Sequence, residues 1–308
     1  MAHLAQHVPA WLRDFARPLR PVVRAAHLWS EADGLRMSAA MSFYGILSLA
    51  PLLILMVAVF GWWLDRDVLE QGLVSQIGLV VGQQGGALVK QALASAKEPA
   101  DGILASLLGF GVLLFGATGV FTELQEAFER LWRHGRAAPP KEKWWHGASL
   151  RLRGVGYILA FGFMLLVSLV VSTMLNLFSG WAGNWMGFET VLRVLNEAVA
   201  FAISAALFLA LMRISAGPKP AVKLLIVGAV AGAILFTIGR QVLTLYLSTA
   251  AVVSAYGAAG SLIVLLMWIY FSAGVLLFSA GFARALEEER AQRVTPAAAS
   301  AAVPARAQ

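Results

Sequence analysis

Cysteine and charged residues are what this chain of 308 residues lacks. It has no cysteine, so a disulfide framework, a cysteine-ligated zinc site and a thiol nucleophile are excluded. Charged residues make up only 13% of the chain, whereas a soluble domain carries about 25%. Apolar residues make up 59%, and the mean hydropathy is +0.73. A soluble protein of this length could not bury so much apolar side chain, so the composition predicts an integral membrane protein.

Motifs for catalysis and for cofactor binding are also missing. The five histidines form neither HExxH nor HxH, and the chain has no Walker loop, no GxSxG and no dinucleotide-binding glycine motif at a strand–helix junction. A metal site needs several ligands at suitable spacing. The sequence therefore predicts a protein that is not an enzyme and that uses no metal and no cofactor.

Six apolar segments are each long enough to cross a bilayer, which takes about 20 residues at 1.5 Å per residue. They are too long for buried strands and too apolar on all sides for amphipathic surface helices. The sequence thus predicts an all-α polytopic bundle, with a membrane domain over 38–285. Its spans lie at about 38–64, 102–121, 154–178, 192–211, 224–247 and 258–282.

Lysine and arginine are distributed unevenly between the two sides of these spans. Nineteen of the 24 lie in the N-terminal arm, the second-to-third loop, the fourth-to-fifth loop and the C-terminal tail. Four lie on the other side, and Arg240 lies within a span. Because cytoplasmic loops are enriched in these residues, both termini are predicted to be cytoplasmic. An even number of spans requires the same.

The segments outside the spans differ in character. Residues 1–37 form a basic, proline-broken cytoplasmic arm, which either is solvated or lies in part flat on the inner leaflet. Residues 65–101 have apolar residues at helical spacing, interrupted at Gly82, Gly85 and Gly86. This pattern predicts two short amphipathic helices on the outer face, which either cap the bundle or contact a partner. Residues 286–308 are rich in alanine and proline after Val294 and are expected to form a disordered cytoplasmic tail.

The loop over 130–153 combines seven positive charges with Trp132, Trp144 and Trp145. In a soluble protein this composition would suggest nucleic acid. Between two spans on the cytoplasmic side, attraction to anionic lipid headgroups explains both the charges and the tryptophans. Membrane lipids, and not nucleic acid, are therefore the expected partner. The candidate headgroup contacts are Arg130, Arg133, Arg136, Lys141, Lys143, Trp144 and Trp145.

Two ionisable residues lie within predicted spans, Glu197 in the fourth and Arg240 in the fifth. Glu197 is 16 residues from Arg213 and Arg240 is 17 from Lys223, so both lie about 24–26 Å from the cytoplasmic edge. Charge in hydrocarbon is costly unless it is paired or faces water, so an ion pair in the outer part of the bundle is expected. The pair could fix helix register, line a polar cavity open to the outside, or reach water. The candidate cluster is Glu197, Arg240, Asn176 and Asn196.

Two small-residue features concern helix packing. Gly228-x-x-x-Gly232 in the fifth span permits close approach of a neighbouring helix. Pro51 in the first span removes one backbone hydrogen bond and is expected to kink that helix.

Three segments resemble the signature segments of the YihY/BrkB family of bacterial inner-membrane proteins. They are SAAMSFYGILSLAP at Ser38–Pro51, GATGVFTELQEAFERLW at Gly116–Trp132, and the last span from Tyr256 to Ala285. The likeness covers about residues 30–290 and the same number of spans. The positions that carry it are Ser42, Tyr44, Ser48, Pro51, Gly116, Trp132, Tyr256, Gly257, Gly260, Trp268 and Tyr270.

The resemblance implies an inner (plasma) membrane protein with a role in the cell envelope. Members were once labelled ribonuclease BN, a role for which this chain lacks the histidine-rich metal ligands. One branch of the family is linked to export of a lipid A precursor, so the expected function is movement of a lipid or other amphiphile. The alternative is a non-transporting scaffold for envelope integrity, which could be a homo-oligomer. Where the family has Gln and Glu late in the sixth span, this chain has Gly274 and Gly281, so a role of that Glu does not carry over.

Overall fold

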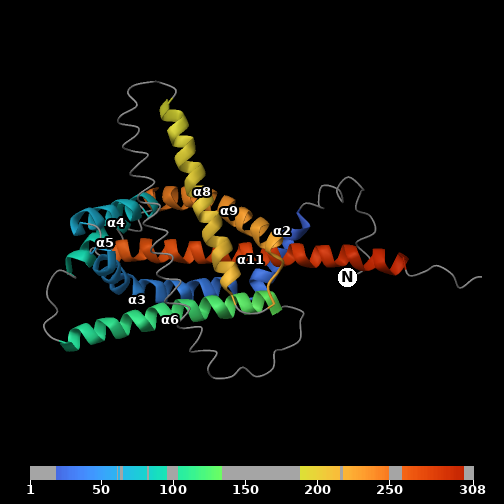
Figure 1. The fold of residues 1–308 in the computed structure, drawn as a ribbon, viewed down its shortest axis with the longest axis horizontal. Helices are drawn as coiled ribbons and strands as arrows, with labels where there is room; N and C mark the ends of the chain where they lie inside the picture. The colour runs from blue at the N-terminus through green and yellow to red at the C-terminus, as the bar shows by residue number, and fades with distance from the viewer. Residues whose placement is uncertain are drawn as a thin grey trace, which may run out of the picture.

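The computed structural model describes residues 19–60, 62, 65–81, 83–95, 103–133, 188–215, 218–249 and 259–301. Regular structure in these ranges is entirely helical, as the sequence predicts (Figure 1). The helices are α2 (Arg20–Glu31), α3 (Gly34–Phe60), α4 (Arg66–Val81), α5 (Gln83–Ser95), α6 (Ile103–Arg133), α8 (Phe188–Ile214), α9 (Val222–Thr249) and α11 (Gly260–Ala301).

Helices occupy five of the six segments predicted as spans, namely α3, α6, α8, α9 and α11. The third predicted span, 154–178, lies outside the described residues. Within the part of the chain that is described, two segments are long and apolar enough to cross a membrane, Val222–Tyr246 of α9 and Gly260–Arg293 of α11. Their mean hydropathies are 2.2 and 2.3. The chain therefore has the helical, apolar character of a membrane protein.

The long helices α3, α6 and α11 lie beside one another, with α9 against α11 and α8 against α9 (Figure 1). The short helices α4 and α5 gather at one end of this bundle, and α2 crosses α11 toward the other end. We call the end near α2 the α2 end and the opposite end the α4–α5 end.

The long helices meet at small residues. A Cβ atom placed on Gly116 of α6 would lie 2.8 Å from Cβ and 2.9 Å from the backbone N of Ser48 on α3. A Cβ atom on Gly228 or Gly232 of α9 would lie 2.8 Å from Ser279 O or 2.6 Å from Ser279 Cβ on α11. The predicted close packing at Gly228-x-x-x-Gly232 is therefore confirmed. The helix α3 continues through Pro51 to Phe60.

The main apolar core lies toward the α2 end, where α2, α6, α9 and α11 meet the last turns of α8. Its most deeply buried large side chains are Leu28, Phe128, Leu131, Trp132, Met212, Leu225 and Leu277. For residues 20–37, this core excludes a fully solvated arm, which is one of the two alternatives that the sequence leaves open; the other, a segment that lies in part on the inner leaflet, is compatible with it. Ala25 and Leu28 of α2 and Met37 of α3 are buried in the core, since α2 and α3 both pack against α11.

The C-terminal segment also differs from the expected disordered tail, because α11 continues from the predicted span through Ala301. Ion pairs one turn apart support this extension: Arg293 Nη2 lies 2.6 Å from Glu289 Oε1, and Arg284 Nε lies 3.5 Å from Glu288 Oε1. Residues 302–308 lie outside the described residues.

The predicted pair of short helices after the first span is present as α4, which ends at Val81, and α5, which begins at Gln83. Gly85 and Gly86 lie inside α5, where Gly86 lets the backbone approach Val74 O of α4. A second apolar cluster joins the two helices to α3 through Leu53, Leu69, Leu73, Val89 and Leu93. The pair also contacts α11, so it covers the α4–α5 end of the bundle, as a cap would.

The α3–α6 contact yields a prediction. Gly116→Ala should lower the stability of the folded protein by about 1–3 kcal/mol, because the added methyl group would overlap Ser48. Thermal unfolding of the purified protein in detergent measures the loss. The matched control is Gly111→Ala on the same helix, where the methyl group meets nothing within 4 Å. The control should keep or slightly raise the unfolding temperature, since alanine is the better helix former. Equal effects of the two variants would contradict the contact.

Candidate functional site

The structure brings Glu197 of α8 and Arg240 of α9 together. The two helices are joined by a short connection around Pro218 and lie side by side. Arg240 Nη2 donates a hydrogen bond to Glu197 Oε2 over 3.2 Å, which is the pairing expected from the residue spacing. Asn196 lies in α8 next to Glu197, and its side chain is not described. Asn176 lies outside the described residues.

This ion pair lies at an apolar surface of the α8–α9 hairpin. The side chain of Glu197 is 53% exposed and that of Arg240 25% exposed. Val194, one turn before Glu197 on α8, is also an exposed large apolar side chain, and Ile238 and Val242 are exposed elsewhere on α9. The pair joins α8 to α9, and the exposed part of the Glu197 carboxylate remains accessible from outside the protein. The pair can offer both an acceptor and a donor to a polar group that reaches this surface.

Most of the described family-signature residues contribute to packing. Ser42 and Ser48 donate hydrogen bonds to backbone oxygens of their own helix, Ala39 O and Gly45 O. Tyr44 lies against Gly119 of α6, and Trp268 is buried beside Phe236 and Phe271. Gly260 begins α11, and Tyr270 lies within it. Tyr256 and Gly257 lie outside the described residues, and of Pro51 only the helical backbone is described.

Trp132 does not lie at a lipid interface, contrary to what the composition of the 130–153 loop suggested. Its side chain is fully buried and stacks on Phe128, with the ring centroids 5.6 Å apart. Its Nε1 donates a hydrogen bond to Ser215 Oγ over 2.8 Å. The partner hydroxyl comes from the end of α8, so a contact distant in sequence takes this tryptophan into the core.

Two of the predicted headgroup contacts, Arg130 and Arg133, lie in ion pairs within the protein. Arg130 Nη1 lies 3.1 Å from Asp33 Oδ2, and Arg133 Nε lies 2.8 Å from Glu129 Oε1. Together with Glu126 and Glu129, the two arginines line a shallow surface depression of about 290 Å³. The depression therefore has mixed charge. The other five candidates, Arg136, Lys141, Lys143, Trp144 and Trp145, lie outside the described residues.

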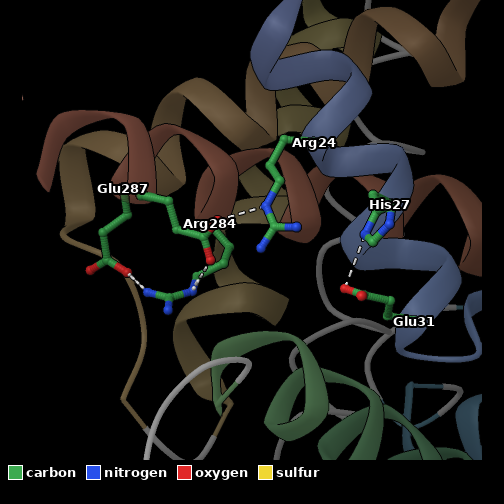
Figure 2. A network of polar contacts seen from close by, with 6 residues as sticks. Arg24, His27, Glu31, Arg284 and Glu287 are labelled. Carbon is green, nitrogen blue, oxygen red and sulfur yellow. Dashed lines mark hydrogen bonds and ion pairs between the residues drawn. The ribbon is translucent and has the colours of Figure 1, made fainter. Parts of the chain in front are cut away.

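A polar network that the sequence did not predict joins α2 to α11 (Figure 2). Arg24 Nε lies 2.8 Å from Glu288 Oε2, and this hydrogen bond raises the pKa of the Arg24 guanidinium. Arg284 pairs with Glu287 and Glu288 on its own helix, and only 8% of its side chain is exposed. One turn further along α2, His27 Nδ1 lies 3.2 Å from Glu31 Oε2. The pairs within one helix could be read from their spacing, but the Arg24–Glu288 contact leaves no local signal.

Gly281 and Gly274 lie where α2 and the start of α3 approach α11. A Cβ atom on Gly281 would lie 3.2 Å from the backbone oxygen of Ala25 on α2. A Cβ atom on Gly274 would lie 3.6 Å from Ser38 Oγ and 4.0 Å from Trp29 Cζ2. A long acidic side chain at 281 would push α2 away, so the glycine is part of how this chain holds α2.

Within the described ranges, no group of three or more His, Asp or Glu side chains is arranged to hold a metal ion. The described chemistry consists of ion pairs at a helical bundle with apolar outer surfaces.

These features define the class as a helical membrane protein. A family model described as virulence factor BrkB matches residues 25–304, and the chain belongs to that family. The ribonuclease-like protein YfkH of Bacillus subtilis (strain 168) is 26% identical over 266 residues, which cover 84% of this chain and 91% of that protein. No solved structure matches the chain. The family membership indicated by the sequence segments is thus confirmed.

The ion pair yields a prediction. Glu197→Ala alone should reduce the folded yield more than Glu197→Ala combined with Arg240→Ala, because the single change leaves a guanidinium without its partner at an apolar surface. The coupling between the two sites should be about 0.5–3 kcal/mol, measured by thermal unfolding of the two single variants and the double variant. The exchanged pair, Glu197→Arg with Arg240→Glu, should recover part of the loss. Equal damage from the single and the double variant would refute the coupling.

Proposed function

We propose that the protein crosses the bacterial inner (plasma) membrane six times and moves a lipid or another amphiphile between the leaflets, in support of the cell envelope. Both termini lie in the cytoplasm, and the α4–α5 pair lies on the outer side. The proposal includes no enzymatic activity, no metal or cofactor and no nucleic-acid partner. The ribonuclease-like name belongs to the Bacillus relative, and this chain carries no motif of a metal-dependent nuclease.

The observation that carries the transport proposal is the half-exposed ion pair on the apolar face of α8 and α9. A headgroup that crosses hydrocarbon loses its hydration, and this loss is the main barrier to movement. The pair supplies a carboxylate and a guanidinium at a surface that acyl chains can also reach. A lipid could therefore keep its tails in the bilayer while its headgroup exchanges water for protein partners.

The distribution of lysine and arginine supports the proposed orientation, with 19 on one side of the predicted spans and four on the other. The same charges favour anionic headgroups on the cytoplasmic side. Since Arg130 and Arg133 already pair with carboxylates, we assign them a structural role first. The proposal leaves headgroup attraction mainly to Arg136, Lys141 and Lys143.

The second candidate is a non-transporting scaffold that maintains envelope integrity, either as a single chain or as a homo-oligomer. The close contacts at Gly116, Gly228 and Gly232 favour it, because helices locked at glycines have little freedom to separate. The capping position of α4 and α5 also suits a rigid body. Movement of lipid is the property that separates the two candidates.

The orientation can be tested with single cysteines, because the natural chain has none. Lys90→Cys places a thiol on α5, and Arg293→Cys places one at the end of α11; both positions are exposed. On intact spheroplasts, a membrane-impermeant maleimide should label Lys90→Cys at once and Arg293→Cys only after permeabilisation. The cysteine-free protein is the control for background. Labelling in the opposite order would show that the orientation is inverted.

Transport can be tested in vesicles that contain the purified protein and a trace of fluorescent lipid. The fraction of label that dithionite reaches should rise several-fold faster than in empty vesicles for at least one anionic lipid. Glu197→Ala with Arg240→Ala should lower that rate, and the control Gly111→Ala should not, since its methyl group touches nothing. Rates equal to those of empty vesicles across several lipid classes would exclude the exporter and leave the scaffold.

A further inference from the structure

The helix α2 has three distinct faces. At 3.6 residues per turn, Pro21, Ala25 and Leu28 share the face that is buried against the bundle. A second face carries the polar residues Arg20, Arg24, His27 and Glu31. The third face carries Leu19, Val22, Val23 and Ala26, which are all exposed, Val23 to 67%. We call this third set the outer stripe.

Contacts with α11 show how these faces are oriented. The polar face meets α11 at Glu288, beyond the predicted span at 258–282, through Arg24. The other edge of α2 carries Trp29, whose ring lies near Gly274, inside that span. Glu288 and Gly274 are 14 residues apart, or about 21 Å along the helix. The helix α2 therefore crosses α11 near the end of the span (Figure 1). Its polar face is directed toward the part of α11 beyond the span, because Arg24 meets Glu288 while Trp29 on the other edge lies near Gly274.

This placement matches the chemistry of a membrane surface. An amphipathic helix that lies in the plane of the bilayer places apolar side chains among acyl chains and basic side chains at the headgroups. The outer stripe meets the first requirement. Arg20 on α2 is exposed and basic, which meets the second, whereas the exposed Arg36 at the start of α3 pairs with Asp33. A second protein would also cover the stripe, but nothing at this face is complementary to a particular protein, whereas an anionic leaflet complements both the apolar and the basic residues.

We propose that α2 is an in-plane membrane helix that binds anionic lipid of the leaflet on its side. The outer stripe inserts among the acyl chains, and Arg20 reaches the phosphate groups. The ion pair between Arg24 and Glu288 and the close contact at Gly281 fix α2 to α11 at this depth. The inference concerns attachment and not movement of lipid, so it stands or falls separately from the transport proposal.

The experiment uses a nitroxide label on single cysteines in the full chain, placed in vesicles of phosphatidylcholine and phosphatidylglycerol. Val22→Cys labels the outer stripe, and the matched control His27→Cys labels the polar face, about 140° away around the helix axis. Collision with oxygen, which concentrates in lipid, is compared with collision with a water-soluble nickel chelate. At position 22 oxygen should dominate, and at position 27 the chelate should dominate. Ala26→Cys replaces Val22→Cys if the latter does not fold.

Two outcomes would overturn the proposal. If position 22 meets the chelate as often as position 27 does, the stripe is solvated. If position 22 is shielded from both reagents, protein covers it, as in a contact with a second copy. Vesicles of phosphatidylcholine alone test whether anionic headgroups contribute: without anionic lipid the label at position 22 should move toward the chelate. An unchanged label would show that Arg20 contributes no attraction to phosphate charge.

Discussion

Close approach of helices at small residues is the constraint on which the rest of this structure depends. In a lipid environment, apolar side chains gain little by leaving acyl chains for a neighbouring helix, so tight packing must hold the helices together. Here α6 lies against α3 at Gly116 and Ser48, and α9 lies against α11 at Gly228, Gly232 and Ser279. These contacts set the distance between the long helices, and thereby the positions of the buried core and of both polar clusters. Gly116 and Ser48, which meet in one of these contacts, are both family-signature positions, so this part of the signature describes packing.

The charged residues at the α2 end hold protein elements together as well as marking orientation. Arg24 binds Glu288, and Arg130 binds Asp33 in the turn between α2 and α3. Since acidic residues contribute little to the orientation signal, such pairing leaves the imbalance of lysine and arginine informative. The pairing does reduce the capacity of Arg24 and Arg130 to bind lipid headgroups. A surface that binds the membrane at this end must then use other groups, and the outer stripe with Arg20 supplies them.

The sequence predicted the helices well because each needs only a long apolar run, which is a local property. It predicted their ends less well: α6 continues to Arg133 and α11 to Ala301, sustained by ion pairs such as Glu129–Arg133 and Glu289–Arg293. The Glu197–Arg240 contact could be predicted because both residues were counted from one short connection. The burial of Trp132 could not, since its partner Ser215 is 83 residues away.

The helix α2 is a further case, because the sequence predicts an arm there and not a packed helix. Its composition is basic and its prolines suggest irregular backbone, but Pro21 lies in the first turn of the helix, where a proline costs no hydrogen bond. The glycine at 281 is one of the features that hold α2 on the bundle, because it lets the backbone of Ala25 lie close to α11. The buried side chains of Ala25 and Leu28 and the ion pair between Arg24 and Glu288 are others, and the residues they meet are distant in the sequence.

The exposure of Glu197 bears on the choice between transporter and scaffold. An ion pair that only fixed helix register would need no exposed group, and a carboxylate that extends beyond the protein is stable where water or a polar group solvates it but not among acyl chains. Arg240 is the better enclosed partner, and Glu197 is the one that extends outward. An arrangement with the acceptor group outermost suits contact with a donor that arrives from outside the protein, such as the amine or hydroxyl groups of a headgroup. The transport proposal needs such a contact and the scaffold proposal does not, so the exposure of Glu197 is a feature on which the two proposals differ.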